Sequence, residues 1–235
     1  MTQNQTIGQI VAEDIRTATV FNKHGLGFCC GGGKTVKSAC EEKSINIAEL
    51  LNDIEALLVQ SDSTDVFQSM HLNKLIDHIY NQHHKYIYEK GPITAEFINK
   101  VARVHGENHP ETIEIAKLYN SLLAELHQHM MKEEQILFPI IKRMVSEHAA
   151  FSSFVNDPIS VMKMEHDNAG DILKRMTNLS GSYTPPEDVC NTYRAAYANL
   201  KELENNIHVH IHLENNILFP KTLELEAQLL ELSVK

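Results

Sequence analysis

The chain has no tryptophan, only 7 prolines and 10 glycines, and no long uninterrupted apolar run in its 235 residues. Without a run of about 18 apolar residues, a membrane-spanning helix is not expected. Because proline and glycine are the residues that most disfavour helices, their scarcity favours helical structure. The N-terminal MTQNQTIGQI has neither a basic start nor an apolar stretch, so we do not expect a secretory signal.

Positive charge and cysteine are also scarce. The chain has 21 Lys and Arg residues and 31 Asp and Glu residues, which gives a net charge of −10. Nucleic acids and anionic membranes both require a basic face, so neither is an expected partner. The four cysteines, Cys29, Cys30, Cys40 and Cys190, form no disulfide framework, and we expect a cytoplasmic protein. Cys40 and Cys190 are interpreted as ordinary buried thiols.

What the sequence does contain is helical periodicity, so we predict an all-α protein. Residues 1–62 predict a small helical N-terminal domain, and the polar run 60–65 predicts a linker. Residues 66–235 predict an up-down four-helix bundle. Helix-periodic segments lie at 72–89, 95–105, 112–145, 159–179 and 188–231, with breaks expected at Gly91-Pro92, His109-Pro110, Asp157-Pro158 and Pro185-Pro186.

The second block contains an internal repeat. HMMKEEQILFP at 129–139 aligns without gaps to HIHLENNILFP at 210–220, sharing the His, the Glu four residues later and the Ile-Leu-Phe-Pro end. An earlier histidine precedes each copy at nearly the same offset: His84 lies 45 residues before His129, and His166 lies 44 before His210. We interpret the block as a duplicated helix pair.

Each copy places a histidine and a glutamate on one helix face, because residues i and i+4 are neighbours there. Both faces are apolar: Leu122, Leu126, Ile136 and Ile140 flank the first pair, and Leu203, Ile207 and Ile217 flank the second. A lone His-x-x-x-Glu is usually a surface pair contributing about 0.3–0.5 kcal/mol. Two pairs on duplicated apolar faces instead indicate buried carboxylates that need a cation. Imidazole and carboxylate donors suit iron, manganese, zinc or copper.

The motifs HMMKEEQILFP, PISVMKMEHDNAG, HIHLENNILFP and FCCGGG together resemble the repair-of-iron-centres family, which joins an N-terminal di-cysteine domain to a hemerythrin-like bundle. The resemblance implies two iron ions with a bridging oxide or hydroxide, in a protein that repairs iron–sulfur clusters damaged by oxidative and nitrosative stress. The ligands that it implies are His84, His105, His129, His166 and His210, with Glu133 and Glu214 as bridges. This set leaves one of about twelve positions on two octahedral ions open.

Several choices around this site stay open. Periodicity alone lets His83 compete with His84, and His212 compete with His210; the repeat offset and the resemblance favour His84 and His210. Glu125 and Glu165 either orient a ligand or line a route for ions, or they are merely solvated.

Cys29 and Cys30 are the candidate reactive residues of the N-terminal domain. They are adjacent and precede three glycines, so they match neither a zinc site nor a thioredoxin-type pair. The two thiolates would bind iron, relay electrons or contact a partner. The alternative is a structural turn with incidental cysteines.

Three functions follow from these features. The first is supply of iron to damaged iron–sulfur proteins. The second is an oxidoreductase that binds NO and reduces it at the open iron position. The third is an O₂ carrier or sensor. The presence of the di-cysteine domain argues against this function. The oligomeric state stays open, with a homodimer as one alternative.

Overall fold

The computed structural model describes residues 3–28, 32–58, 67–147 and 155–233. Contacts divide the chain into two compact units, Met1–Leu75 with Met144–Ser152 and His208–Lys235, and Ile76–Arg143 with Ser153–Ile207. Within the described ranges the only β pairing is a single antiparallel bridge between Thr6 and Thr35, so the all-α prediction is confirmed. Cys29, Cys30 and the predicted linker at 60–65 lie outside the described residues.

The N-terminal part of the first unit consists of short helices, α1 (Ile7–Glu13), α2 (Thr17–Lys23), α3 (Val36–Lys43) and α4 (Ile47–Leu58). Side-chain caps define two of the starts. Thr6 and Gln9 form a reciprocal capping box at α1, and the Thr35 hydroxyl accepts the Ser38 N–H at α3. Ile10, Phe21, Leu50 and Ile54 are fully buried and form the core of this part.

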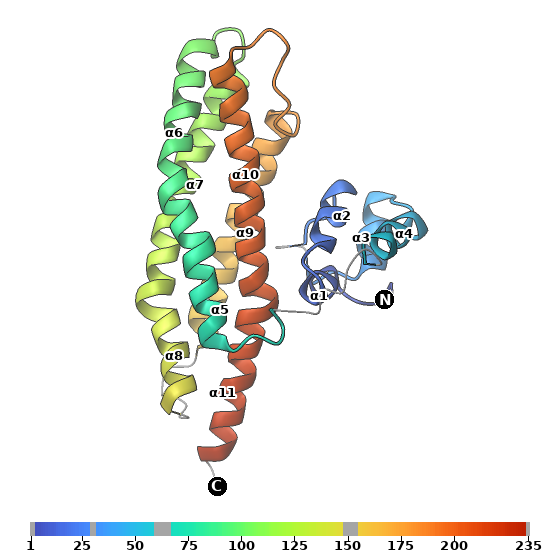
Figure 1. Cartoon of the computed structure of the whole chain (residues 1–235), viewed down its shortest axis with the longest axis vertical. Helices are drawn as coiled ribbons and strands as arrows, with labels where there is room; N and C mark the ends of the chain where they lie inside the picture. The colour runs from blue at the N-terminus through green and yellow to red at the C-terminus, as the bar shows by residue number, and fades with distance from the viewer. Residues whose placement is uncertain (1–2, 29–31, 59–66, 148–154, 234–235) are drawn as a thin grey trace. The chain divides into compact units, whose positions relative to one another are not determined.

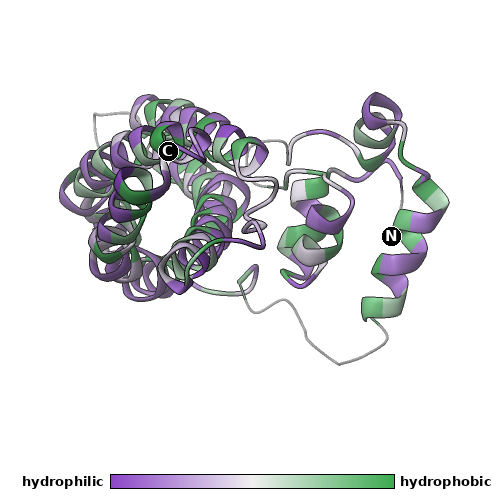
Figure 2. Cartoon of the chain, turned by 90° about the horizontal axis from the view of Figure 1, so that it is seen from above, coloured by the Kyte–Doolittle hydropathy of each residue, from purple (hydrophilic) through white to green (hydrophobic). Residues whose placement is uncertain are grey.

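The remaining helical segments include the longest helices of the described chain (Figure 1). In chain order they are α5 (Leu72–Ile79), η1 (Tyr80–His84), α6 (Lys85–His105), α7 (Glu111–Lys132), η2 (Glu133–Leu137), α8 (Phe138–Glu147), α9 (Asn156–Leu179), α10 (Asn191–Leu213), η3 (Glu214–Leu218) and α11 (Phe219–Ser233). The segments labelled η are π-helical turns. Helices α6, α7, α9 and α10 form the predicted four-helix bundle, and Figure 2 looks down its axis, with hydrophobic and hydrophilic residues on every helix.

The expected break at Gly91-Pro92 is wrong, because α6 continues through Pro92. Packing against α7 outweighs the helix-breaking tendency of Pro92. A Cβ on Gly91 would lie 2.5 Å from Leu123 Cδ1, so the glycine allows α7 to approach closely. The Tyr119 hydroxyl of α7 also donates to the Gly91 carbonyl at 2.9 Å. Tertiary contacts therefore hold the helix where local propensity would end it.

Among the described residues, none of the helices combines the length and the apolar character needed to cross a membrane.

Candidate metal centre

Three π-helical turns mark the candidate site. His84 is the last residue of η1, while Glu133 and Glu214 are the first residues of η2 and η3. Pro139 and Pro220 follow the last two turns at the end of the repeated Ile-Leu-Phe-Pro segment. A proline removes one i→i−4 hydrogen bond and clashes with the carbonyl four residues earlier, so a widened turn before it relieves both problems. Such turns occur frequently at functional sites.

The π turns shift the buried face by one residue, which regular α-helical spacing did not predict. Ile136, expected on the buried stripe, is 52% exposed, whereas its neighbour Leu137 is 1% exposed. In η1, the two adjacent histidines His83 and His84 are both buried. His83 Nδ1 lies 3.2 Å from the Asn206 amide oxygen, while His84 turns toward Glu133.

In the second unit, three buried histidines gather around the carboxylate of Glu133. The two oxygens of Glu133 face different histidines: Oε2 lies 3.4 Å from His84 Nε2, and Oε1 lies 3.3 Å from His129 Nε2. His166 Nε2 lies 3.0 Å from the same nitrogen of His129. All four residues are at most 3% exposed. Glu133 is therefore placed to bridge two positions, with an imidazole nitrogen at each.

The other ring nitrogen of two histidines faces an acidic partner. His84 Nδ1 lies 2.8 Å from Glu134 Oε1, and His129 Nδ1 lies 2.9 Å from Glu165 Oε2. A carboxylate accepts, so each Nδ1 donates and each Nε2 presents a lone pair. Two acceptors, Nε2 and the carboxylate of Glu133, then point at each other in a buried space. A cation between them removes this repulsion, and the outer carboxylates orient the rings as they do in metal sites.

Glu165 is itself held in its charged form. Burial alone would raise its pKa, but hydrogen bonds from Lys132 and His129 outweigh burial and lower the pKa below its usual value. Glu165 is thus a partner of a candidate ligand rather than a solvated side chain. Glu125 differs, because its hydrogen bonds join it to Ser121 and Asn168 at the protein surface.

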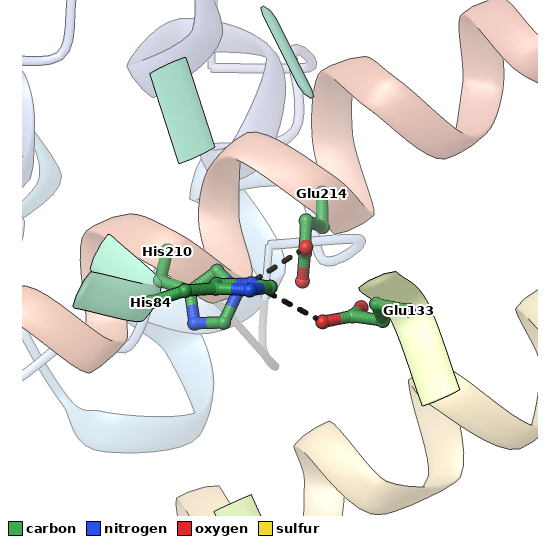
Figure 3. Close-up of side chains that lie close together, drawn as sticks. All are labelled: His84, Glu133, His210 and Glu214. Carbon is green, nitrogen blue, oxygen red and sulfur yellow. Dashed lines mark ion pairs between the residues drawn. The ribbon is translucent and has the colours of Figure 1, made fainter. Parts of the chain in front are cut away.

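In the first unit, His210 and Glu214 form the matching pair one helical turn apart. His210 Nε2 lies 3.1 Å from Glu214 Oε1, and both residues are fully buried. Figure 3 shows this ion pair and that of His84 with Glu133 as dashed lines. His212, the competing candidate, has another role: its Nδ1 accepts from the Asn216 amide at 2.9 Å, and Phe28 packs edge-on against its ring.

Two overlapping groups of four side chains have the spacing of metal sites. One group contains His84, His210 and both glutamates, Glu133 and Glu214 (Figure 3); the other contains His129, His166 and the same two glutamates. In each group the ligand atoms lie within 4.8 Å of one another. Two donors on opposite sides of one ion, each about 2.0–2.2 Å from it, would be about 4 Å apart. Six of the seven predicted ligands therefore come together in two groups that fit a cation each.

His105 does not join them. It is the last residue of α6, at the other end from η1 and His84. The two positions are 21 residues apart, or roughly 30 Å at about 1.5 Å per residue, so both histidines cannot bind one centre. His105 Nε2 instead lies 3.3 Å from the Sγ of Cys190. Cys190 is exposed, which corrects the expectation of a buried thiol, whereas Cys40 is buried as expected.

A cavity of about 590 Å³ reaches the second group of ligands. It lies between α7 and α9, and its lining is mostly apolar, with Leu122, Leu126 and Met164 among the wall residues. His129, His166 and Glu165 contribute polar atoms to the same wall. A small uncharged molecule could therefore approach this side of the candidate centre.

Comparison with known proteins decides the family. Residues 75–222 match a family described as the hemerythrin HHE cation-binding domain, and residues 3–58 match a domain of unknown function (ScdA_N, DUF542). The chain is 38% identical over 224 residues to the iron–sulfur cluster repair proteins YtfE of Yersinia pestis and Yersinia pseudotuberculosis, covering 95% of this chain and 99% of each relative. The chain belongs to the repair-of-iron-centres family. All six grouped ligands lie within the cation-binding domain of this family, and Cys29 and Cys30 lie within its N-terminal domain.

Proposed function

We propose that this protein is a di-iron protein that repairs damaged iron–sulfur clusters by supplying iron. The observation that carries the proposal is the pair of four-residue groups that share Glu133 and Glu214. Shared carboxylates are the donors expected where two cations lie close together. The names of the related Yersinia proteins support cluster repair as the function.

The donor set fits iron. Each group offers two imidazole nitrogens and two carboxylate oxygens, and none of the grouped side chains is a thiolate. Nitrogen and oxygen donors of this kind suit iron among the transition metals. With a bridging oxide or hydroxide, each ion would have five of about six positions filled. Without His105 the count leaves one position open on each ion, instead of one on the pair.

The chain's own residues would both hold and release the metal. The carboxylates of Glu134 and Glu165 fix the rings of His84 and His129 with Nε2 toward Glu133, where the metal would bind. Imidazole and carboxylate donors compete with protons, so affinity falls as these groups are protonated. Damaged iron–sulfur proteins are the proposed acceptors of the released iron, and Cys29 and Cys30 are proposed to assist the transfer.

Reconstitution of an inactivated iron–sulfur enzyme tests this proposal. We expect the iron-loaded protein to restore activity, and we expect Cys29→Ser with Cys30→Ser to weaken the effect. His105→Ala is a matched control that should retain both iron and repair. The iron-donor proposal fails if metal-free protein, or free iron at the same concentration, restores the enzyme equally well.

The cavity beside His129 and His166 supports NO reduction as a second candidate function, because a diatomic molecule fits it easily. Two NO, two electrons and two protons would give N₂O and water, with electrons entering through Cys29 and Cys30. Gas analysis under turnover with a chemical reductant distinguishes this function from iron supply. N₂O no higher than in a protein-free control rules it out.

A further inference from the structure

Cys190 and His105 form a pair of reactive side chains at the end of α6 remote from His84. Cys190 immediately precedes α10, and its carbonyl accepts the N–H groups of Tyr193 and Arg194. His105 Nε2 approaches the Cys190 Sγ at 3.3 Å from the end of α6. A thiol beside an imidazole is the arrangement that activates a cysteine nucleophile. Nothing in the proposed iron chemistry uses this pair.

The surroundings of the sulfur favour its thiolate form. The backbone N–H of Tyr193 and the ring of His105 lower the pKa of the Cys190 thiol to about 7. Partial positive charge at the start of a long helix acts in the same direction. The other titratable side chain lining the space beside the sulfur is Lys100, which is also cationic.

A small pocket adjoins the sulfur. Its volume is about 40 Å³, and Val101, Val104 and Thr192 line it together with His105 and Lys100. One water molecule requires about 10–15 Å³ by a comparable measure, so the pocket admits a molecule of a few heavy atoms. A hydroperoxide group fits this space, whereas a peptide-sized disulfide would have to remain outside it.

We propose that Cys190, paired with His105, is a thiol-oxidation site whose oxidant is a small hydroperoxide. The thiolate attacks one peroxide oxygen, so the S–O bond forms as the O–O bond breaks. The sulfur gives up two electrons, and the other oxygen leaves as hydroxide or alkoxide. It takes a proton from the His105 ring or from water, which gives a sulfenic acid and water or an alcohol.

The first test is peptide-resolved alkylation of the full-length protein by iodoacetamide across pH 5.5–9.5. We expect the rate at Cys190 to have its midpoint near pH 7, while Cys40 is unlabelled because it is buried. His105→Gln should move the midpoint upward. A thiol of pKa about 8.5 is only about 3% thiolate at pH 7, against about half for a pKa of 7. Allowing for the higher nucleophilicity of the more basic thiolate, a full return of the pKa to 8.5 should lower the rate at pH 7 about 3- to 4-fold.

The second test treats the protein with hydrogen peroxide at pH 7 and traps sulfenic acid with a dimedone-type reagent. We expect the adduct at Cys190, less of it in His105→Gln, and none in Cys190→Ser. Protein stripped of metal should give the same result, which separates this site from the proposed iron centre. A circular dichroism spectrum confirms that each variant folds.

Three outcomes would overturn the proposal. The first is a wild-type alkylation midpoint at pH 8.5 or above, and the second is equal trapping in wild type and His105→Gln. The third is a faster modification of Cys190 by glutathione disulfide than by hydrogen peroxide at equal concentration, which would assign a disulfide as the reactant. Each of these results leaves the iron-repair proposal untouched.

Discussion

Replacing Glu165 by glutamine removes a negative charge from beside His129 and keeps the shape of the side chain. In the wild type, Glu165 Oε2 lies 2.9 Å from His129 Nδ1, and Lys132 donates to the other oxygen. The charge fixes Nδ1 as a donor and strengthens Nε2 as a ligand. Losing such a partner typically weakens metal binding about 10- to 100-fold, or about 1.4–2.7 kcal/mol.

The loss should fall on one of the two ions. His129 belongs only to the group that also contains His166, whereas His84 keeps its own partner, Glu134. Chelator competition on the iron-loaded variant should therefore show one iron per chain released about 10- to 100-fold more easily and the other little changed. In the wild-type protein, the two irons should not show this difference in ease of release.

Glu125→Gln is the matched control for this experiment. Glu125 lines the same cavity as Glu165, but its hydrogen bonds join it to Ser121 and Asn168 instead of a ligand. We expect iron release from Glu125→Gln to follow the wild type. If iron binding weakens equally in the two variants, the charge of the cavity, and not the orientation of His129, controls the affinity for iron. No weakening in Glu165→Gln would refute the orienting role.

Three further predictions concern stability and pH. Tyr119→Phe removes the hydrogen bond to the Gly91 carbonyl and should lower the free energy of unfolding by about 0.5–1.5 kcal/mol, measured by urea denaturation. Gly8→Ala would place a Cβ 2.5 Å from Asn216 Oδ1 and 3.0 Å from the Gly32 carbonyl oxygen, and this crowding should destabilise the protein by about 1–3 kcal/mol in the same assay. The pKa of Glu165 is lowered in the folded chain, so its carboxylate stabilises the fold above its ordinary value of 4.5, and this contribution is lost as pH falls through the lower folded value. The stability difference between metal-free wild type and Glu165→Gln should therefore shrink between pH 5 and pH 3; a constant difference would contradict this.

Sequence periodicity was sufficient to predict the helical fold, and the repeat pointed to part of the candidate site. The gapless repeat identified both His-x-x-x-Glu pairs, because an i,i+4 relation depends only on local helix geometry. Helical periodicity alone could not place Ile136 or decide between His83 and His84, because each π turn inserts one extra residue into the helical register. The signal that could have indicated η2 and η3 is the proline at the end of each repeat, whereas no proline follows η1 as closely.

The errors at His105 and Cys190 have a different origin. Treating Gly91-Pro92 as a break concealed that His84 and His105 lie at opposite ends of a nearly continuous helix. The proximity of Cys190 to His105 depends on how α10 packs near the end of α6, which spacing along the chain does not encode. The same is true of Glu134 and Glu165, whose role follows from the ring nitrogens that they face.

Metal content of purified variants, together with the absorption spectrum, shows whether the bundle binds two irons. We predict two irons per chain with oxo-bridge bands in the wild type and in His105→Ala, and loss of iron in His129→Ala and His210→Ala. A single zinc per chain would contradict this prediction, as would full iron retention in the last two variants or loss of iron in His105→Ala.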